Sequence, residues 1–306
     1  MSIRSTLLSV LVLLALAAAT TAGQQARGPA EERPAEELSM KGKIVLITGS
    51  TDGLGRDVAL RVAAMGAHVI VHGRNEERGA AVVGEIAKQK AGSARFYAAD
   101  FAALANVRQL AETVLRDYDR LDVLVNNAGI WLSSGGRQVS RDGHEMHFAV
   151  NYLAGYLLTR LLLPRLVESA PSRIVNVASG AQSPIDFTDV MLTRPGRASQ
   201  GYAQSKLAQV MFTFDLAREL EGRRVIATAL HPATLMNTGM VRAARMRAQS
   251  TVEEGARAVV NLATAPGIAN GQYYDGLRPA SAHAQAYDEK ARAQLRELSA
   301  ALAGRR

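Results

Sequence analysis

Two side chains near position 200 have the types and the spacing of an acid and base couple. Tyr202 and Lys206 stand four positions apart, and residues with this spacing share one face of a helix. A cation beside a phenol favours the phenolate, so we expect Lys206 to lower the pKa of Tyr202 toward the range useful for proton transfer. Ser179 ends an apolar run upstream and could add a hydroxyl. Taken alone, the pair is more often an ordinary aromatic and a solvated cation.

A glycine-rich turn lies far upstream of this couple. Residues 43–48 are apolar and β-branched, as in a buried strand, and a helix-compatible segment runs to about Met65. Gly49, Gly53 and Gly55 lie between them. Strand, glycine turn and helix form the context in which a phosphate binds at a helix N-terminus. The first glycine would permit the tight turn, the second would let the backbone approach a pyrophosphate, and the third would let helix and strand pack closely.

These motifs together resemble the short-chain dehydrogenase/reductase family over about residues 41–303. The glycines follow the spacing Gly-x-x-x-Gly-x-Gly, and Asn-Asn-Ala-Gly at 126–129 follows a strand-like segment at 121–125. The resemblance implies an α/β fold with a single Rossmann-type, doubly wound parallel sheet and helices on both faces. Length and composition agree with one such domain, which we assign to residues 41–306.

The resemblance also implies a catalytic set formed by Asn151, Ser179, Tyr202 and Lys206. Tyr202 would donate a proton in carbonyl reduction or accept one in alcohol oxidation, while Lys206 lowers the phenol pKa and holds the nicotinamide ribose. Ser179 would hydrogen-bond the substrate oxygen, and Asn151 would complete a proton relay. The predicted function is hydride transfer between NADP(H) and a small carbonyl or alcohol substrate. The alternative is a catalytically silent sensor or scaffold that binds NADP, against which the intact set argues.

Cofactor contacts follow from the same resemblance. The expected contacts are Gly49, Ser50, Thr51, Gly53, Leu54, Gly55, Arg74, Asp100, Asn127, Ala128, Gly129, Tyr202, Lys206, Pro232 and Thr234. Asp100 would lie near the adenine ring, and Pro232 begins a segment similar to the one that closes over the nicotinamide. Ala233 replaces the common glycine of that segment, which leaves open whether Thr234 or Thr238 meets the cofactor.

The choice between NADP and NAD depends on the end of the second predicted strand, at about 68–72. Gly73, Arg74 and Asn75 follow it, where an NAD site usually offers a carboxylate to the adenosine ribose. Arg74 could instead form charge-assisted, bidentate hydrogen bonds with a 2′-phosphate. We therefore predict NADP, with NAD as the alternative if Arg74 is only solvated.

The segment between Ser179 and Tyr202 and the stretch at 271–276 resemble the retinol dehydrogenase and WW-domain oxidoreductase branch of the family. Trp131 is the only tryptophan, so the paired tryptophans of a WW domain are absent. The branch implies a lipophilic substrate. Methionines at 236, 240 and 246, in the expected lid, agree with that preference because methionine adapts to varied apolar shapes.

Composition excludes several other classes. The net charge is +8, but the arginines are scattered among acids and form no basic stripe, so a nucleic-acid partner is not expected. The absence of cysteine excludes disulfides and thiol catalysis. His144 and His147 are the only histidines near metal-ligand spacing. We interpret them as packing or cap groups and predict no metal site.

The N-terminus carries a separate signal. Arg4 precedes an apolar run at about 7–19, so residues 1–22 have the form of a signal peptide or N-terminal membrane anchor, and residues 23–40 read as a polar linker. The run is short for a full membrane span. Three interpretations stay open: membrane association, which we rank first, export after cleavage, and a cytoplasmic protein whose translation starts at Met40.

Self-association is a further expectation. The apolar segments at about 148–166 and 202–220 correspond to helices that commonly build a dimer face in the family. The alternative is that their apolar side chains face the protein's own sheet. A homodimer is therefore one possible state of the chain.

Overall fold

The computed structural model describes residues 39–132 and 136–304. The predicted signal peptide or anchor at 1–22, and the predicted linker up to residue 38, lie outside the described residues. Across the described part of the chain, no helix is both long enough and apolar enough to cross a membrane.

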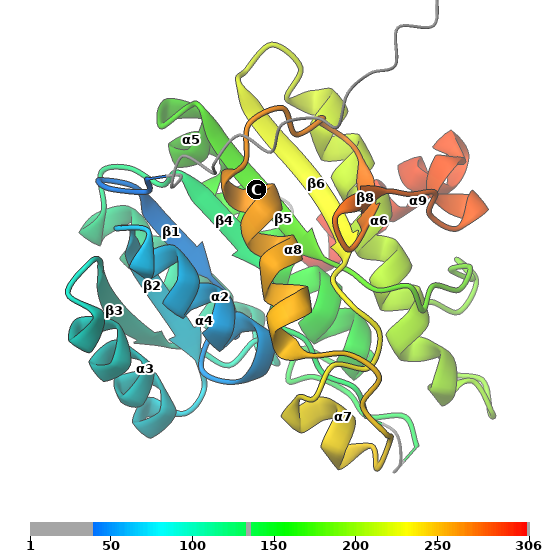
Figure 1. Ribbon diagram of the computed structural model, residues 1–306. Helices are drawn as coiled ribbons and strands as arrows, with labels where there is room; N and C mark the ends of the chain where they lie inside the picture. Colours follow the sequence, from blue (N-terminus) through cyan, green and yellow to red (C-terminus); the bar gives the residue numbers. More distant parts are fainter. Residues whose placement is uncertain (1–38, 133–135, 305–306) are drawn as a thin grey trace, which may run out of the picture. The chain divides into compact units, whose positions relative to one another are not determined.

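One open sheet forms the centre of the fold (Figure 1). Its strand order is β3-β2-β1-β4-β5-β6-β7-β8, and every neighbouring pair is parallel except β7 with β8. The strands are β1 (Ile44–Ile47), β2 (His68–Gly73), β3 (Ser93–Ala98), β4 (Val123–Asn126), β5 (Ser172–Val177), β6 (Val225–His231), β7 (Tyr273–Asp275) and β8 (Arg278–Pro279). The predicted doubly wound α/β fold is confirmed, with a short antiparallel edge strand added.

The helices alternate with the strands along the chain (Figure 1). They are α2 (Gly53–Ala64), α3 (Glu76–Gln89), α4 (Leu104–Asp117), the π-helix η1 (Phe148–Leu153), α5 (Ala154–Glu168), the 3₁₀ turn η2 (Ala198–Gln200), α6 (Gly201–Glu219), α7 (Gly239–Ala243), α8 (Val252–Thr264), the 3₁₀ turn η3 (Ala284–Tyr287) and α9 (Glu289–Leu302). Local sequence signals set several of the helix starts. Asn75 caps α3 by accepting a hydrogen bond from the Arg78 amide (2.8 Å), and Thr251 with Glu254 forms a capping box on α8.

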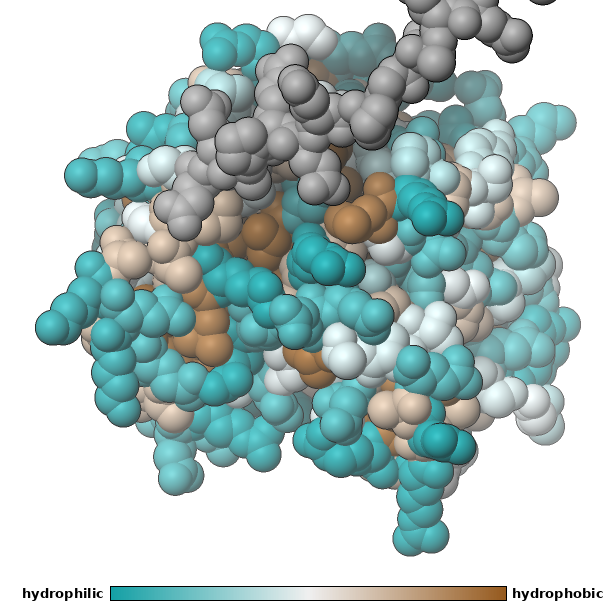
Figure 2. All heavy atoms as spheres, in the orientation of Figure 1, coloured by the Kyte–Doolittle hydropathy of each residue, from teal (hydrophilic) through white to brown (hydrophobic). Residues whose placement is uncertain are grey.

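Two apolar cores lie on the two faces of the sheet. Alternate strand residues point to opposite faces, so Leu46 and Leu124 join one core while Val45 and Val125 join the other. The first core is closed by α4, α5 and α6, and the second by α2, α3 and α8. On the face shown in Figure 2, hydrophilic side chains predominate and hydrophobic ones form small separate areas. The strands therefore bury both faces, as expected for a parallel sheet.

The two helices expected to form a dimer face pack mainly within the chain. Leu157, Leu158, Leu207, Val210 and Met211 are each at most 4% exposed. The C-terminal helix α9 packs on α6, where the Arg292 Nε lies 2.8 Å from Asp215 Oδ1. This arrangement agrees with the alternative in which these side chains face the protein's own core. Self-association stays a prediction.

Candidate active site

The predicted site residues gather at one edge of the sheet. Strands β1, β4, β5 and β6 are parallel neighbours, so their carboxyl ends meet at the same edge, where ligands bind in open α/β sheets. The glycine turn follows β1, Asn127 follows β4, Ser179 follows β5, and Pro232 follows β6. The topology thus brings together segments that are far apart in the sequence.

The glycine turn packs directly against the segment after β4. A Cβ on Gly49 would lie 2.8 Å from the Ala128 Cα, and one on Gly55 would lie 2.4 Å from both Asn127 Nδ2 and Gly49 O. The Asn127 side chain donates to Thr48 O (2.8 Å) and Gly49 O (3.1 Å). The close approach leaves no room for side chains at these glycines. A glycine turn that leads into the start of a helix in this way fits the pyrophosphate of a dinucleotide.

Asn151 ties two parts of the site together. It lies within η1 and is almost fully buried. Its Nδ2 donates to Ile130 O (3.1 Å) and to Ser205 Oγ (3.0 Å) on α6, and its Oδ1 accepts from the Ile130 amide (2.7 Å). The π-helical turn found here is frequent at functional sites. The asparagine therefore links the segment after β4 to the helix that carries Tyr202 and Lys206.

Lys206 is buried near Tyr202, the predicted proton donor. Its ammonium donates to Val177 O (2.8 Å) and to Gln209 Oε1 (3.0 Å), and it lies 5.7 Å from the centre of the Tyr202 ring. Burial lowers the pKa of Lys206 to about 7. Such a lysine changes its charge easily at neutral pH.

Tyr202 differs from the expectation in one respect. Burial raises the pKa of its phenol, and hydrogen bonding with Ser179 opposes that rise. We expected Lys206 to lower this pKa, but desolvation dominates, and the ammonium is directed at Val177 and Gln209 instead. The geometry does place tyrosine, serine and lysine in one neighbourhood, as the spacing predicted.

The backbone of Ser179 is held by two residues that the sequence patterns did not identify. Gln182 Nε2 donates to Ser179 O (2.8 Å), and the Tyr273 hydroxyl donates to the same oxygen (3.0 Å). Ser179 Oγ accepts from the Ala181 amide (3.1 Å). Tyr273 belongs to the 271–276 stretch already associated with the family branch, but no spacing rule connected it with Ser179.

At the predicted adenosine end, Arg74 is accessible. Its side chain is 69% exposed, and its Nη1 lies 3.9 Å from Asp100 Oδ1. Arg78, which was not predicted, lies nearby through its contact with Asp52 (3.4 Å) on the cap of α2. Arg74 directly follows β2, so its guanidinium is available to a ligand at the end of that strand.

His72 is a second residue that the sequence analysis missed. It is fully buried at the end of β2, accepts from the Gly49 amide at Nδ1 (3.1 Å) and donates from Nε2 to Ala99 O (3.2 Å). Its ring stacks on Phe101 with centroids 4.3 Å apart. Burial lowers the pKa of His72 to about 4. The neutral ring therefore joins the glycine turn to the segment that carries Asp100.

The two threonines after β6 that were candidates for the cofactor contact have different surroundings. Thr234 Oγ1 lies 3.0 Å from His231 Nε2. Thr238 caps α7, and its Cγ2 lies 3.2 Å from where a Cβ on Gly53 would be. Thr238 is thus the threonine packed beside the glycine turn.

Within the residues described, no group of three or more metal-ligating side chains occurs.

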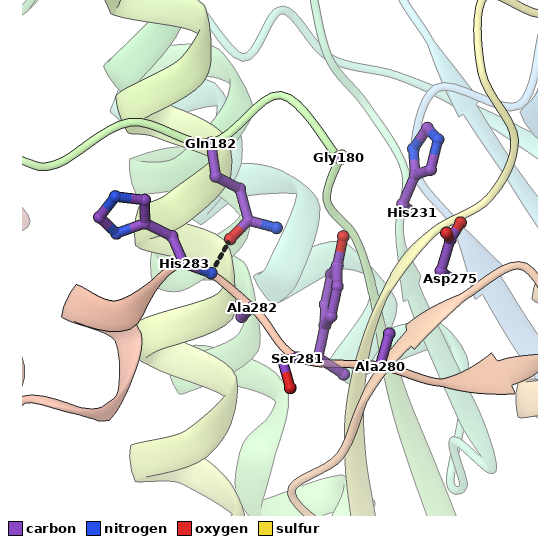
Figure 3. A pocket seen from close by; sticks show the side chains of 9 residues that line it. Gly180, Gln182, His231, Asp275, Ala280, Ser281, Ala282 and His283 are labelled. Atoms are coloured by element: carbon purple, nitrogen blue, oxygen red, sulfur yellow. Dashed lines mark hydrogen bonds between the residues drawn. The ribbon is translucent and has the colours of Figure 1, made fainter.

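A pocket of about 320 Å³ adjoins Ser179 on its downstream side (Figure 3). In Figure 3, His231 and Asp275 lie on one side, and Gln182 and His283 on the other. The His283 amide donates to Gln182 Oε1 (2.9 Å). The pocket therefore presents hydrogen-bonding groups close to Ser179, alongside the Tyr273 ring.

Comparisons with known proteins give one consistent result. The short chain dehydrogenase family model matches residues 43–250. Human retinol dehydrogenase 13 is 35% identical over 291 residues, covering 88% of this chain and 86% of that protein. Among solved structures, the RhlG/NADP active-site complex of Pseudomonas aeruginosa has a TM-score of 0.65 with 26% identity, over 78% of this chain and 96% of that one. The 3-ketoacyl-(acyl-carrier-protein) reductase of Brucella melitensis complexed with NADH has a TM-score of 0.62 with 28% identity, over 78% and 97%.

Proposed function

The chain belongs to the short-chain dehydrogenase family, and we propose that it transfers hydride between NADP(H) and a carbonyl or alcohol substrate through Asn151, Ser179, Tyr202 and Lys206. It is an oxidoreductase that acts on alcohol and carbonyl groups with a nicotinamide cofactor. The specific proposal is supported by two sets of neighbours: a Cβ on Gly129 would lie 3.4 Å from Asn151 Oδ1 and 3.6 Å from Lys206 Nζ, and Ser179 is hydrogen-bonded to Tyr202. The four side chains come from η1, the end of β5, and α6.

Each residue has a role that agrees with its surroundings. The bound nicotinamide would supply or accept the hydride. Tyr202 would hold the transferred proton at its hydroxyl oxygen, and the burial that raises its pKa keeps the phenol protonated, as donation to a carbonyl requires. Ser179 would donate a hydrogen bond to the substrate oxygen as negative charge develops there. Lys206, with its pKa near neutrality, would take up or release a proton within the relay that Asn151 holds together.

For the cofactor we propose NADP, with Arg74 as the ligand of the 2′-phosphate. The exposed guanidinium of Arg74 and the neighbouring Arg78 support this preference. No carboxylate follows β2 at the position where NAD-binding sites usually carry one. NAD is the alternative. The remaining expected contacts with the cofactor, from the glycine turn to Pro232 and Thr234 or Thr238, belong to the same proposal.

For the substrate we propose a lipophilic aldehyde, ketone or alcohol that carries a polar group. The methionines of the segment after β6 support an apolar body, since Met246 is 43% exposed there. The pocket beside Ser179 supports a polar group, because His231, Asp275 and Gln182 line it. A polar substituent of the substrate would have His231 and Asp275 as hydrogen-bonding groups there.

Location and assembly complete the proposal. We keep membrane association through residues 1–22 as the first choice, with export after cleavage and a start at Met40 as alternatives. Carbonate washing of membranes should leave the full-length chain in the pellet, and complete release would reject an anchor.

A homodimer is the alternative to a monomer. Light scattering after size exclusion would distinguish the two by mass.

The function is tested with the purified full-length chain. NADPH consumption is followed across a panel of aliphatic, aromatic and polyene aldehydes and ketones. The Tyr202→Phe variant is measured in parallel. We expect turnover that the variant loses while NADPH binding is retained. Turnover that survives in Tyr202→Phe would reject the assigned proton donor. Tight NADPH binding without turnover of any substrate would favour the catalytically silent sensor or scaffold.

A further inference from the structure

A buried acid and imidazole pair lies next to Tyr202 and takes no part in the mechanism above. Glu145 is 2% exposed and His147 is 4% exposed. Glu145 Oε1 lies 2.8 Å from His147 Nδ1, and this imidazole is its only ion-pair partner among the residues that the structure describes. A buried carboxylate needs such compensation. The sequence analysis interpreted His147 as a packing or cap group, and the structure gives it a more specific environment.

The hydrogen bonds fix which nitrogen of His147 carries the proton. The Leu132 amide donates to His147 Nε2 (3.0 Å), so Nε2 is the acceptor and Nδ1 carries the hydrogen that it donates to Glu145 Oε1. Glu145 Oε2 accepts from the Phe148 amide (2.8 Å) at the first residue of η1. One ordered chain therefore runs from the segment after β4, through the imidazole and the carboxylate, to the helix that holds Asn151.

The same pair borders the start of α6. The His147 ring meets the Tyr202 ring edge to face, with centroids 6.3 Å apart and planes at 87°. The Trp131 ring also lies beside the Tyr202 ring, with centroids 5.7 Å apart. A Cβ on Gly201 would lie 2.7 Å from both Glu145 Oε1 and His147 Nδ1. The pair thus fills the space against Gly201, and a carboxylate beside the first turn of a helix is electrostatically favourable.

We propose that Glu145 and His147 are positioning residues that fix the Tyr202 ring relative to Asn151 and the Trp131 segment. They touch the three segments that must meet: the one after β4, the start of η1 and the start of α6. The kinetic part of this inference rests on the proposed function, and its structural part does not. Displacing a reacting group by about 1 Å can cost on the order of 100-fold in rate.

Two substitutions separate the hydrogen bonds of His147 from its ring. His147→Phe keeps an aromatic edge against Tyr202 but removes both hydrogen bonds, whereas His147→Gln can accept from Leu132 and donate to Glu145 without a ring. If the ordered chain positions Tyr202, His147→Phe should lower kcat by on the order of 10- to 100-fold with little change in NADPH affinity. His147→Gln should recover a large part of that loss.

Trp131 supplies a readout that does not depend on turnover. It is the only tryptophan of the chain, and it directly precedes Leu132, whose amide is held by His147. We expect His147→Phe to change the emission and acrylamide quenching of Trp131, and His147→Gln to leave them near the wild type. His68→Phe is the matched control for His147→Phe and should leave Trp131 unchanged, because His68 also makes two side-chain hydrogen bonds and contacts an aromatic ring, Tyr118.

The outcomes are distinct. Unchanged Trp131 emission in His147→Phe would overturn the inference, whether or not the wild type turns over a substrate. Absence of turnover in the wild type would count against the proposed function alone. Changed emission with wild-type kcat would overturn the positioning role. If His147→Phe does not fold, Glu145→Gln is measured instead, because His147 and Phe148 donate to different oxygens of Glu145 and the amide has an acceptor at only one of these two positions. It should then show the same fall in kcat and the same change in Trp131, and wild-type values for both would reject the inference.

Discussion

The ammonium nitrogen of Lys206 lies 5.7 Å from the centre of the Tyr202 ring and donates to Val177 O and Gln209 Oε1. The two groups are neighbours on α6 but are not hydrogen-bonded to each other in this structure. Burial acts on them in opposite directions, raising the pKa of the phenol and lowering that of the ammonium to about 7. Both shifts favour the neutral form, so the phenol keeps its proton at neutral pH while the ammonium loses its proton more easily.

Lys206 should give the protein a measurable dependence of stability on pH. Its folded pKa of about 7 is below its ordinary value of 10.5, so between these values the unfolded chain binds more protons and stability rises with pH. Below pH 7 the full cost of burying the ammonium remains. Lys206→Met removes this contribution, so the Tm of the variant minus that of the wild type should fall from pH 7 to pH 10. A constant difference would contradict the assignment.

His72 predicts a second pH dependence, in the acid range. Burial lowers its pKa from 6.5 to about 4. As pH falls through this window, the unfolded chain takes up a proton that the folded chain resists, so stability decreases. His72→Gln can still accept from Gly49 and donate to Ala99, but it does not titrate. The Tm advantage of the wild type over His72→Gln should shrink from pH 6.5 to pH 4, and a difference that does not vary with pH would reject this origin.

The fold and the elements that carry the candidate catalytic residues were predictable because both depend on local pattern and order. Strand, glycine turn and helix at 43–65 appear as expected, and Asn151, Tyr202 and Lys206 lie on the helices that their segments predicted. Parallel topology then requires the strand ends to meet at one edge. The roles of these residues and the cofactor contacts stay predictions.

The residues that the sequence analysis missed act through contacts between distant segments. His72 meets Gly49, and Tyr273 meets the backbone of Ser179, across separations that no periodicity encodes. The prediction that Lys206 lowers the pKa of Tyr202 was wrong for a related reason. Spacing shows that Lys206 is near, but only the packed structure shows that desolvation outweighs its charge.

Arg74 is the residue that should decide cofactor preference. A charge-assisted hydrogen bond contributes about 1.5–3 kcal/mol, so Arg74→Ala should weaken NADPH binding by on the order of 10-fold or more and leave NADH binding unchanged. Arg116→Ala removes an equally exposed arginine, paired with Asp117, and serves as the control. Titration of each protein with both cofactors measures the effect. Unchanged NADPH binding in Arg74→Ala would mean that Arg74 is only solvated, and it would favour NAD as the cofactor.

Gly55 tests whether the glycine turn is held by close packing. A Cβ there would lie 2.4 Å from Asn127 Nδ2 and from Gly49 O, and neither group can move freely, because the Asn127 amide donates to Gly49 O and to Thr48 O. Gly55→Ala should lower the free energy of unfolding by about 1–3 kcal/mol through overpacking and should also weaken NADPH binding.

Gly84→Ala is the matched control for that substitution. Gly84 lies inside α3, and a Cβ there would meet no atom within 4 Å. Alanine is the better helix former by about 0.5–1 kcal/mol, so this variant should be slightly more stable, with unchanged cofactor binding. Chemical denaturation of both variants gives the free energies of unfolding. If Gly55→Ala were as stable as Gly84→Ala and bound NADPH normally, the turn would have space for a side chain, and close packing would not explain the glycine at position 55.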